Sequence, residues 1–359
     1  MRIFYQSPVS REWIRQRPHF MADGLAAAGH RVFWFYAAAV GRCRFRRIRG
    51  ADGRLTGLEL PVLPFASRFR PIEWLNRLWI TWWLRRVEAD VLVATNPVAL
   101  PWLPRRLGRV PAVYDCMDVQ TAFFTGRRRV RMAQTEAALL SACRGVVASS
   151  DQIRDFLASR YGVDPAAVAV VPNGVRLAAA SGTEAPVRTD RRPSIAYFGT
   201  VAPWFDWDAV RAAALRHPEW TFDVFGPVDA RPADLPAGVV FHGPIPHGSV
   251  PAQMKAADVL VMPFVRNELI DGVDPVKMYE YLQAGRPIVS SWWPLLEKFR
   301  GFGAVAFYEA GHSLEERIGE ALARPGPCEV PEEFLRANGW DVRVRAFSDA
   351  LERWMGLEG

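Results

Sequence analysis

The chain of 359 residues is 50% hydrophobic and 23% charged, which is typical of a globular protein and excludes an intrinsically disordered one. Its net charge of +7 is uneven. Residues 1–175 contain 26 arginines against 13 acidic residues, a net +13, and the remainder has 19 basic against 25 acidic residues, a net −6. A basic first half favours an anionic partner, such as a membrane surface, a lipid pyrophosphate or a nucleic acid. The alternative is an arginine-rich composition without such a partner.

Length, termini and cysteines set further bounds. The length leaves room for two domains of ordinary size. Because residues 1–5 already have the pattern of a strand, we expect no signal peptide. There is no apolar run of about 18 residues or more, so no membrane span is expected. The four cysteines show no metal-ligand spacing, which predicts a reducing compartment and no metal site.

The first predicted elements are a strand at Arg2–Gln6, a helix that ends near Gly29 and a strand at Val32–Tyr36. The turn and helix start between them contain polar side chains that follow a strand end. Ligands bind at such strand ends in α/β sheets. The candidates for ligand contact are Ser10, Arg11, Arg17 and His19. A histidine at a helix start is also often structural, so both roles remain open for His19.

A basic stretch at Cys43–Arg49 and a predicted strand at Leu58–Pro64 precede a helix at Ile72–Arg86 with four tryptophans. The helix is too short and too charged to span a bilayer. Tryptophan flanked by arginine suits a membrane interface, which predicts contact with the cytoplasmic membrane surface through the Trp74–Arg86 region. The alternative is a helix packed in the core. Single-stranded nucleic acid is not expected as a partner, because no nucleic-acid-binding motif accompanies this stretch.

The next two predicted strands, Ala89–Ala94 and Val110–Tyr114, end in polar residues. Asn96 follows the first strand, and Asp115 and Asp118 follow the second. Carboxylates at a strand end can act as a base or orient a hydroxyl group. Structural capping is the alternative for each aspartate. The arginine run at 127–131 is either an anion contact or a solvated surface.

A strand at Val146–Ser149 and a helix at Gln152–Tyr161 lead to a short strand at Val168–Val171, which the run PNGV follows. Residues 178–192 are rich in Ala, Thr, Pro and Arg and are the predicted linker. A second series of strands begins at Ser194. Gly199 follows the first of these strands and permits close approach of the backbone to a phosphate.

The densest pattern lies at residues 259–291: a strand at Val259–Met262, a polar loop, a helix at Val276–Ala284 and a further strand. Asp274 is placed to cap this helix, and Gly285 to end it. The helix N-terminus favours an anion such as phosphate, to which Lys277 adds a charge. Glu280 suits ribose or sugar hydroxyls. An ordinary βαβ unit with surface Lys and Glu is the alternative.

These motifs together resemble the GT-B glycosyltransferases, in particular family 4-like enzymes of bacterial polysaccharide synthesis. The usual pattern is E-x7-E followed by A-x-G-x-P-V-V-A-S. Glu280 matches the second glutamate, and residues 284–291 match the tail, whereas Gly272 occupies the position of the first glutamate. The form DPVKMYEYL, the run YDCMD and the absence of Arg and Lys after Gly199 resemble the teichuronic-acid-type and xanthan-type subgroup.

The resemblance implies two Rossmann-like, doubly wound α/β domains that face a central cleft. The expected boundaries are an acceptor-binding domain at 1–177, a linker at 178–192, a nucleotide-sugar-binding domain at 193–338, and a C-terminal helix within 339–359 that crosses back to the first domain.

The resemblance also implies sugar transfer from a nucleotide diphosphate sugar, such as a UDP- or GDP-sugar, without cofactor or metal. The expected acceptor is a lipid-linked glycan or polysaccharide, used in the cytoplasm or at the inner face of the membrane. The implied donor contacts are Gly199, Thr200, Trp204, His247, Asp274, Lys277, Met278, Tyr279 and Glu280. The implied acceptor contacts are Ser10, Arg11, Arg17, His19 and Asn96, and the implied catalytic residues are Asp115, Asp118 and Lys277. A nucleotide-sugar epimerase and a non-catalytic, membrane-associated binder of anionic glycan or lipid are the alternatives.

Overall fold

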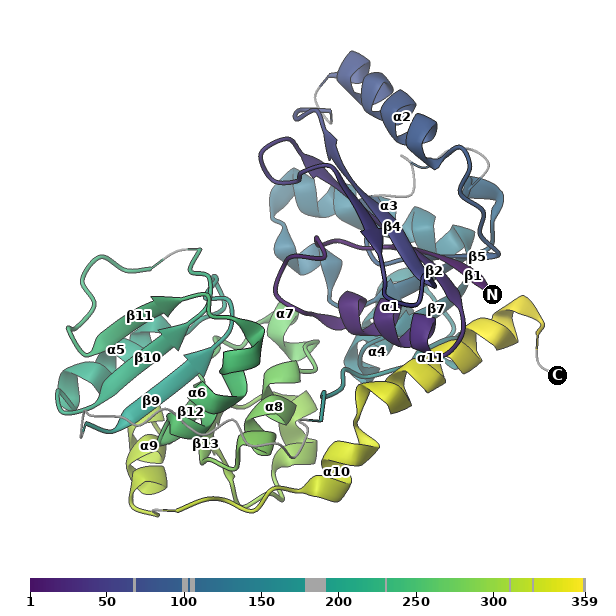
Figure 1. Ribbon diagram of the computed structural model, residues 1–359. Coiled ribbons are helices and arrows are strands. Elements are labelled where there is room, and N and C mark those ends of the chain that lie inside the picture. Colours follow the sequence, from purple (N-terminus) through teal and green to yellow (C-terminus); the bar gives the residue numbers. More distant parts are fainter. Residues whose placement is uncertain are drawn as a thin grey trace. The chain divides into compact units, whose positions relative to one another are not determined.

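The computed structural model describes residues 1–66, 69–98, 103, 107–177, 192–229, 231–309, 311–324 and 326–357. The chain forms two compact units (Figure 1). The first contains Met1–Asn173 together with Trp340–Gly359, and the second contains Gly174–Gly339. Except for Arg192, the predicted linker lies outside the described residues.

The first unit contains an eight-stranded sheet in the order β3-β4-β2-β1-β5-β6-β7-β8. Its pairs are parallel except for β3 with β4. The strands are β1 (Arg2–Gln6), β2 (Arg31–Ala39), β3 (Arg46–Arg49), β4 (Leu55–Val62), β5 (Val91–Ala94), β6 (Ala112–Cys116), β7 (Cys143–Ala148) and β8 (Val168–Val170). The strand order reverses between β1 and β5, and such a switch point is where open α/β sheets bind ligands.

The helices of the first unit are α1 (Arg17–Ala27), α2 (Arg70–Leu84), α3 (Gly126–Ala142), α4 (Asp151–Tyr161) and α11 (Trp340–Met355). Helix α4 begins one residue before its predicted start, and the Ser150 hydroxyl caps it by accepting a hydrogen bond from the Ile153 amide. Helix α11 packs against α1, where the rings of Phe20 and Trp340 stack at 4.7 Å. This contact groups the C-terminal helix with the first unit.

The second unit contains a six-stranded sheet in the order β11-β10-β9-β12-β13-β14, with all pairs parallel. In chain order this is 3-2-1-4-5-6, the Rossmann arrangement, with its switch point between β9 and β12. The strands are β9 (Ser194–Phe198), β10 (Thr221–Phe225), β11 (Val239–Gly243), β12 (Val259–Met262), β13 (Ile288–Ser291) and β14 (Val305–Tyr308). The buried, apolar β12 matches the expectation for a parallel strand covered on both faces.

The helices of the second unit are α5 (Trp207–Arg216), α6 (Val250–Ala256), α7 (Glu268–Asp271), α8 (Val276–Ala284), α9 (Leu314–Leu322) and α10 (Glu332–Ala337). Helix α8 has the predicted bounds and ends at Gly285, whose φ of 64° is the left-handed conformation that glycine adopts without strain.

Two local predictions differ from the structure, and two arginine-rich stretches acquire a defined secondary structure. The polar loop expected around Asp271 instead contains the short helix α7, which Asn267 caps. The arginine run at 127–131 lies in α3, and the basic stretch before residue 50 includes the edge strand β3. The strand expected at Leu58–Pro64 begins earlier, at Leu55.

Candidate functional site

Glycines lie in a row at the carboxyl ends of three neighbouring strands in the second unit. The Gly199 amide donates to the Phe225 carbonyl at 2.9 Å, and the Gly226 amide donates to the Gly243 carbonyl at 2.9 Å. Gly226 has a φ of 135°, and a Cβ at this position would lie 2.1 Å from the Gly199 carbonyl oxygen. Only glycine permits this contact, so the loops after β9 and β10 lie against each other without side chains between them.

A cavity of about 360 Å³ adjoins this glycine row. Its lining includes the ring of Phe241, over which the Arg231 guanidinium lies at 4.8 Å. The lining residues are Gly226, Pro227, Val228, Asp229, Arg231, Phe241, Gly243 and Pro244. A wall with an aromatic ring, a cation and a carboxylate offers both stacking and polar contacts to a flat heterocycle.

Other predicted donor residues lie in the loops that follow β9 and β11. The Thr200 carbonyl accepts from the Tyr197 hydroxyl at 3.0 Å, and the Trp204 carbonyl accepts from the Val265 amide at 2.7 Å. The residues Thr200 and Trp204 are both partly exposed. His247 is exposed and does not line the cavity, although Gly243 of the same predicted loop does.

The N-terminus of α8 presents Lys277 in its first turn. Its ammonium donates to Glu280 Oε2 at 2.7 Å, and the side chains are 29% and 20% exposed, respectively. The two residues predicted to bind phosphate and ribose are therefore neighbours that form an ion pair with each other. Both remain accessible enough to exchange this contact for one with a ligand.

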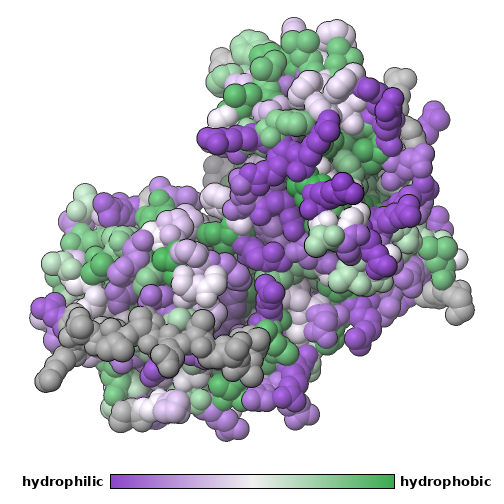
Figure 2. All heavy atoms as spheres, in the orientation of Figure 1, coloured by the Kyte–Doolittle hydropathy of each residue, from purple (hydrophilic) through white to green (hydrophobic). Residues whose placement is uncertain are grey.

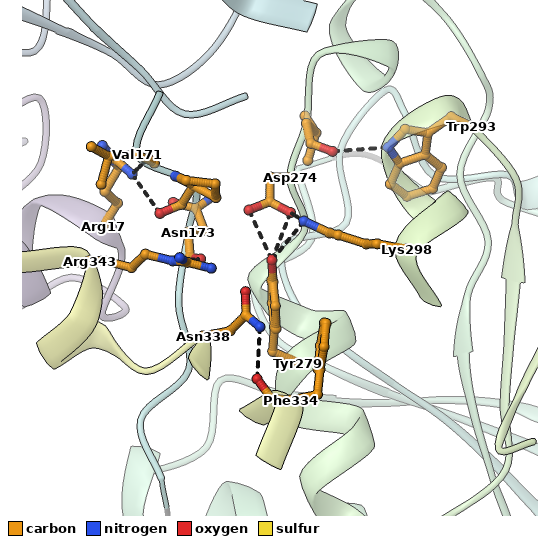
Figure 3. A network of polar contacts seen from close by, with 12 residues as sticks. Arg17, Val171, Asn173, Asp274, Tyr279, Trp293, Lys298, Phe334, Asn338 and Arg343 are labelled. Carbon is orange, nitrogen blue, oxygen red and sulfur yellow. Dashed lines mark hydrogen bonds and ion pairs between the residues drawn. The ribbon is translucent and has the colours of Figure 1, made fainter. Parts of the chain in front are cut away.

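Asp274 does not cap α8, contrary to the prediction. Pro275 occupies the N-cap position, and no side chain caps the helix. The buried Asp274 carboxylate instead accepts from Lys298 Nζ at 2.6 Å and from the Tyr279 hydroxyl at 3.2 Å (Figure 3). Lys298 Nζ also donates to the Tyr279 oxygen at 2.7 Å. Asp274 therefore fixes the loop before α8, and its carboxylate is not available to contact a nucleotide-sugar donor. This corrects its prediction as a donor-binding residue.

The predictions of Met278 and Tyr279 as contacts of the nucleotide-sugar donor are also wrong, because both side chains are buried. Met278 and Tyr279 are both fully buried in the core of the second unit. Their side chains pack between α8 and the core of the second unit, so they cannot reach a ligand on the exposed side of the helix. Lys298 was not predicted from the sequence, although lysine is rare in this chain, which has three. Its contact with Asp274 joins positions 24 apart.

In the first unit, Arg17 and Asp115 form a buried ion pair. Arg17 Nη2 lies 2.9 Å from Asp115 Oδ1, and both side chains are at most 4% exposed. Arg17 Nη1 also donates to the Val171 carbonyl at 2.7 Å (Figure 3), and the Tyr5 hydroxyl donates to Asp115 at 3.3 Å. The Asp115 carboxylate is thus occupied by contacts within the first unit. The predictions of Asp115 as a base and Arg17 as a direct acceptor contact are corrected: the pair ties β6 to α1 and to the end of β8.

Asp118 lies just beyond the same strand in a different environment. Its side chain accepts no helix-capping hydrogen bond, since Val119 is the N-cap of the following turn at Gln120–Phe123. Desolvation raises the pKa of Asp118 to about 6; the charge of Asp115 acts in the same direction, and Arg17 opposes both. A carboxyl group with such a pKa can take up a proton near neutral pH.

Ser10 and Arg11 lie on the loop that follows β1, and His19 lies in the first turn of α1. The buried Glu59, which was not predicted, holds this loop: it accepts from the Ser10 hydroxyl at 2.9 Å and from the Arg11 amide at 2.6 Å. His19 is buried between the Gln16 amide and the Ser10 carbonyl, and burial lowers its pKa. His19 therefore has the structural role, which corrects its prediction as an acceptor contact.

Asn96 lies at the switch point of the first sheet. Its amide donates to Gln6 Oε1 at 3.1 Å, and its side-chain oxygen accepts from the Val98 amide at 2.9 Å. Its side chain is partly exposed at the strand end, where the prediction placed it. Within the described ranges, no group of three or more His, Cys, Asp or Glu side chains is arranged to hold a metal ion.

Two family models match the chain. Residues 19–179 match Glycosyltransferase Family 4, and residues 192–299 match Glycosyl transferases group 1. TuaH from Bacillus subtilis strain 168, named as a teichuronic acid biosynthesis glycosyltransferase, is 28% identical over 222 residues, and the match spans 56% of each chain. The 2-deoxystreptamine glucosyltransferase of Streptomyces kanamyceticus is 31% identical over 282 residues, which cover 66% of this chain and 70% of the relative.

Solved structures share the fold over the whole chain. Sucrose-phosphate synthase from Thermosynechococcus elongatus superposes with a TM-score of 0.77 at 15% identity, covering 99% of this chain and 100% of that one. Anabaena HepE, solved with UDP and glucose, has a TM-score of 0.64 at 15% identity, covering 99% and 95%. The motifs, the two Rossmann-like units and these matches agree: the chain belongs to the family 4-like glycosyltransferases of the GT-B fold.

Proposed function

We propose that this protein transfers a sugar from a nucleotide diphosphate sugar to a hydroxyl group of a glycan acceptor. The observation that carries the proposal is the edge of the second sheet, where a glycine row, a cavity and the N-terminus of α8 with Lys277 lie on one unit. The solved complex of HepE with UDP and glucose supports a nucleotide-sugar donor.

In this proposal the cavity beside Phe241 takes the nucleobase, and the backbone at Gly199 and Thr200 approaches the diphosphate. Lys277 exchanges its contact with Glu280 for the phosphate, which frees the Glu280 carboxylate for ribose hydroxyls. Negative charge grows on the diphosphate as the bond to the sugar breaks. A helix N-terminus and an ammonium group fixed nearby therefore stabilise the transition state more than the ground state.

On the acceptor side, we assign proton uptake to Asp118. Asp115 is engaged by Arg17, whereas Asp118 has a pKa of about 6 and a partly exposed residue surface. Ser10, Arg11 and Asn96 remain the proposed acceptor contacts, because each lies at or near the carboxyl edge of the first sheet.

The proposed acceptor is a lipid-linked glycan or polysaccharide of the bacterial cell surface, used at the inner face of the cytoplasmic membrane. The name of TuaH, a teichuronic acid glycosyltransferase, supports this context. The proposed donor is a UDP- or GDP-sugar, used without a cofactor or metal. We propose no nucleic acid as a substrate or partner.

A thermal-shift panel of UDP, GDP, dTDP and CMP with their sugars tests the donor site. A ligand that binds only the folded protein raises its free energy of unfolding by RT ln(1 + [L]/Kd), and the melting temperature rises with it. We expect one nucleotide class to stabilise the wild type and Lys277→Ala to weaken its binding about ten- to hundredfold, as for loss of a charged hydrogen bond. Lys255→Ala, which removes a lysine from α6, is the control.

Turnover separates the remaining alternatives. A transferase releases nucleotide diphosphate only when an acceptor is present, whereas an epimerase converts the donor without net release of nucleotide. A non-catalytic binder gives no nucleotide-dependent shift at all. Equal shifts for the wild type and Lys277→Ala would refute the phosphate role of Lys277.

A further inference from the structure

Helix α2 has one buried face and, opposite it, an exposed apolar face. Asn76, Ile80 and Leu84 are buried against the first unit. On the outward side, Trp74 is 60% and Trp82 is 52% exposed. We call the outward set the tryptophan face: Trp74, Leu75, Leu78, Trp79 and Trp82. A surface helix normally presents polar residues to water, so this exposed apolar stripe indicates a partner. In Figure 2, green hydrophobic residues lie beside paler ones over α2.

Arginine side chains surround the tryptophan face. The Arg85 guanidinium lies 4.3 Å from the Trp82 ring. Arg47 of strand β3 lies 5.3 Å from the ring of Trp83, which contacts Trp82 at 4.8 Å. Arg70, Arg77 and Arg86 are also exposed on or beside α2. The only acidic residue in the helix is Glu73. The partner must therefore combine an apolar layer with negative charge.

We propose that the tryptophan face docks on the surface of an anionic phospholipid bilayer, with α2 lying in the plane of the membrane. The 15 residues of α2 extend about 22 Å, too short for a hydrocarbon core of about 30 Å. No helix in the described parts of the chain is long and apolar enough to cross a membrane. Tryptophan and leucine then enter the headgroup boundary, and the arginines contact lipid phosphates.

The same charges speak against a second copy of this chain as the occupant. A symmetric dimer through α2 would place the same patch on both sides of the interface, so arginines would face arginines. The membrane proposal deepens the proposed function, since a lipid-linked acceptor is available only at a bilayer. Its test, however, measures vesicle binding and does not depend on turnover.

The experiment is flotation of the full-length protein with vesicles of phosphatidylcholine alone or mixed with phosphatidylglycerol. We expect binding only to the anionic vesicles, falling as salt is raised. The variant Trp74→Ser/Leu78→Ser/Trp82→Ser should lose binding. Arg77→Glu should weaken it by roughly fivefold or more, since each arginine near an anionic surface contributes about that factor.

Matched controls use equally exposed residues elsewhere. Leu215→Ser on α5 and Arg345→Glu on α11 should bind vesicles like the wild type. Nucleotide-induced thermal shifts, measured on every variant, report folding and the donor site independently, so a failed donor site and a failed membrane surface are distinguishable.

Three results would overturn the proposal: wild type that does not float with anionic vesicles, a triple variant that binds as well as wild type, or controls that lose binding to the same degree. Sedimentation that shows a wild-type dimer but a monomeric triple variant would also overturn it, because the tryptophan face would then be a protein interface.

Discussion

Asp115 and Asp118 follow the same strand, yet their surroundings give them different chemistry. The ion pair with Arg17 keeps Asp115 occupied, whereas Asp118 is desolvated without an ion pair of its own among the described contacts. The sequence places both aspartates at a strand end but cannot distinguish them. Arg17 lies 98 positions from Asp115, and only the folded sheet brings the two together.

If Asp118 accepts the acceptor proton, activity depends on its ionised form. Its pKa of about 6 predicts that kcat/KM rises as pH increases through about 6 and then levels off. Asp118→Asn should abolish this acidic limb and lower kcat/KM about a hundred- to ten-thousandfold, the usual contribution of a general base. Asp349→Asn, at an exposed position of α11, is the control. An unchanged acidic limb in Asp118→Asn would exclude this role.

At the scale of elements, the order β12, α8, β13 was predictable because each boundary has a local cause. A short apolar run forms the buried strand, and a left-handed glycine ends the helix. The loop before α8 was not predictable in the same way. Asp274 precedes a proline and looks like a cap, but its carboxylate binds Lys298, 24 positions further along the chain.

The contact between Lys298 and Asp274 holds the loop that leads into α8. Replacing Lys298 with methionine keeps most of the side-chain volume but removes the cation from a buried carboxylate. Because Lys298 is a third exposed, we expect a loss of unfolding free energy of roughly 1 to 3 kcal/mol. Donor affinity should fall as well, since the loop sets the position of Lys277.

Chemical denaturation and nucleotide titration of Lys298→Met check both effects. Lys255→Met controls for loss of a lysine, and Lys298→Arg should retain part of the stability because it keeps the charge. Adding Asp274→Asn to Lys298→Met should cost less than the sum of the single changes, because the carboxylate no longer needs a cation. Simple additivity would mean that the two residues do not act as a pair.

At the scale of the whole molecule, the motifs predicted two Rossmann-like units, and the strand orders confirm this architecture. Strand periodicity gives the strands, but it does not report how close two helices approach. That distance depends on small residues whose neighbours lie far away in the chain. Gly24 of α1 is such a residue: a Cβ there would lie 2.3 Å from Val344 Cγ2 on α11. The packing of α11 on α1 therefore depends on Gly24, although glycine has a low helix propensity and local sequence patterns would not favour it inside α1.

Gly24→Ala should therefore destabilise the protein although alanine favours helix. The methyl group overlaps the stiff, buried Val344, and such overpacking costs about 1 to 3 kcal/mol. Gly319→Ala in α9 is the matched control: its Cβ would meet nothing within 4 Å, so we expect it to be neutral or to stabilise by up to about 1 kcal/mol. Adding Val344→Ala to Gly24→Ala should recover part of the loss, because it removes the overlapping methyl groups. Denaturation of these three variants and of Val344→Ala alone measures the coupling. Equal stabilisation by Gly24→Ala and Gly319→Ala would show that α11 does not rest on α1 at this contact.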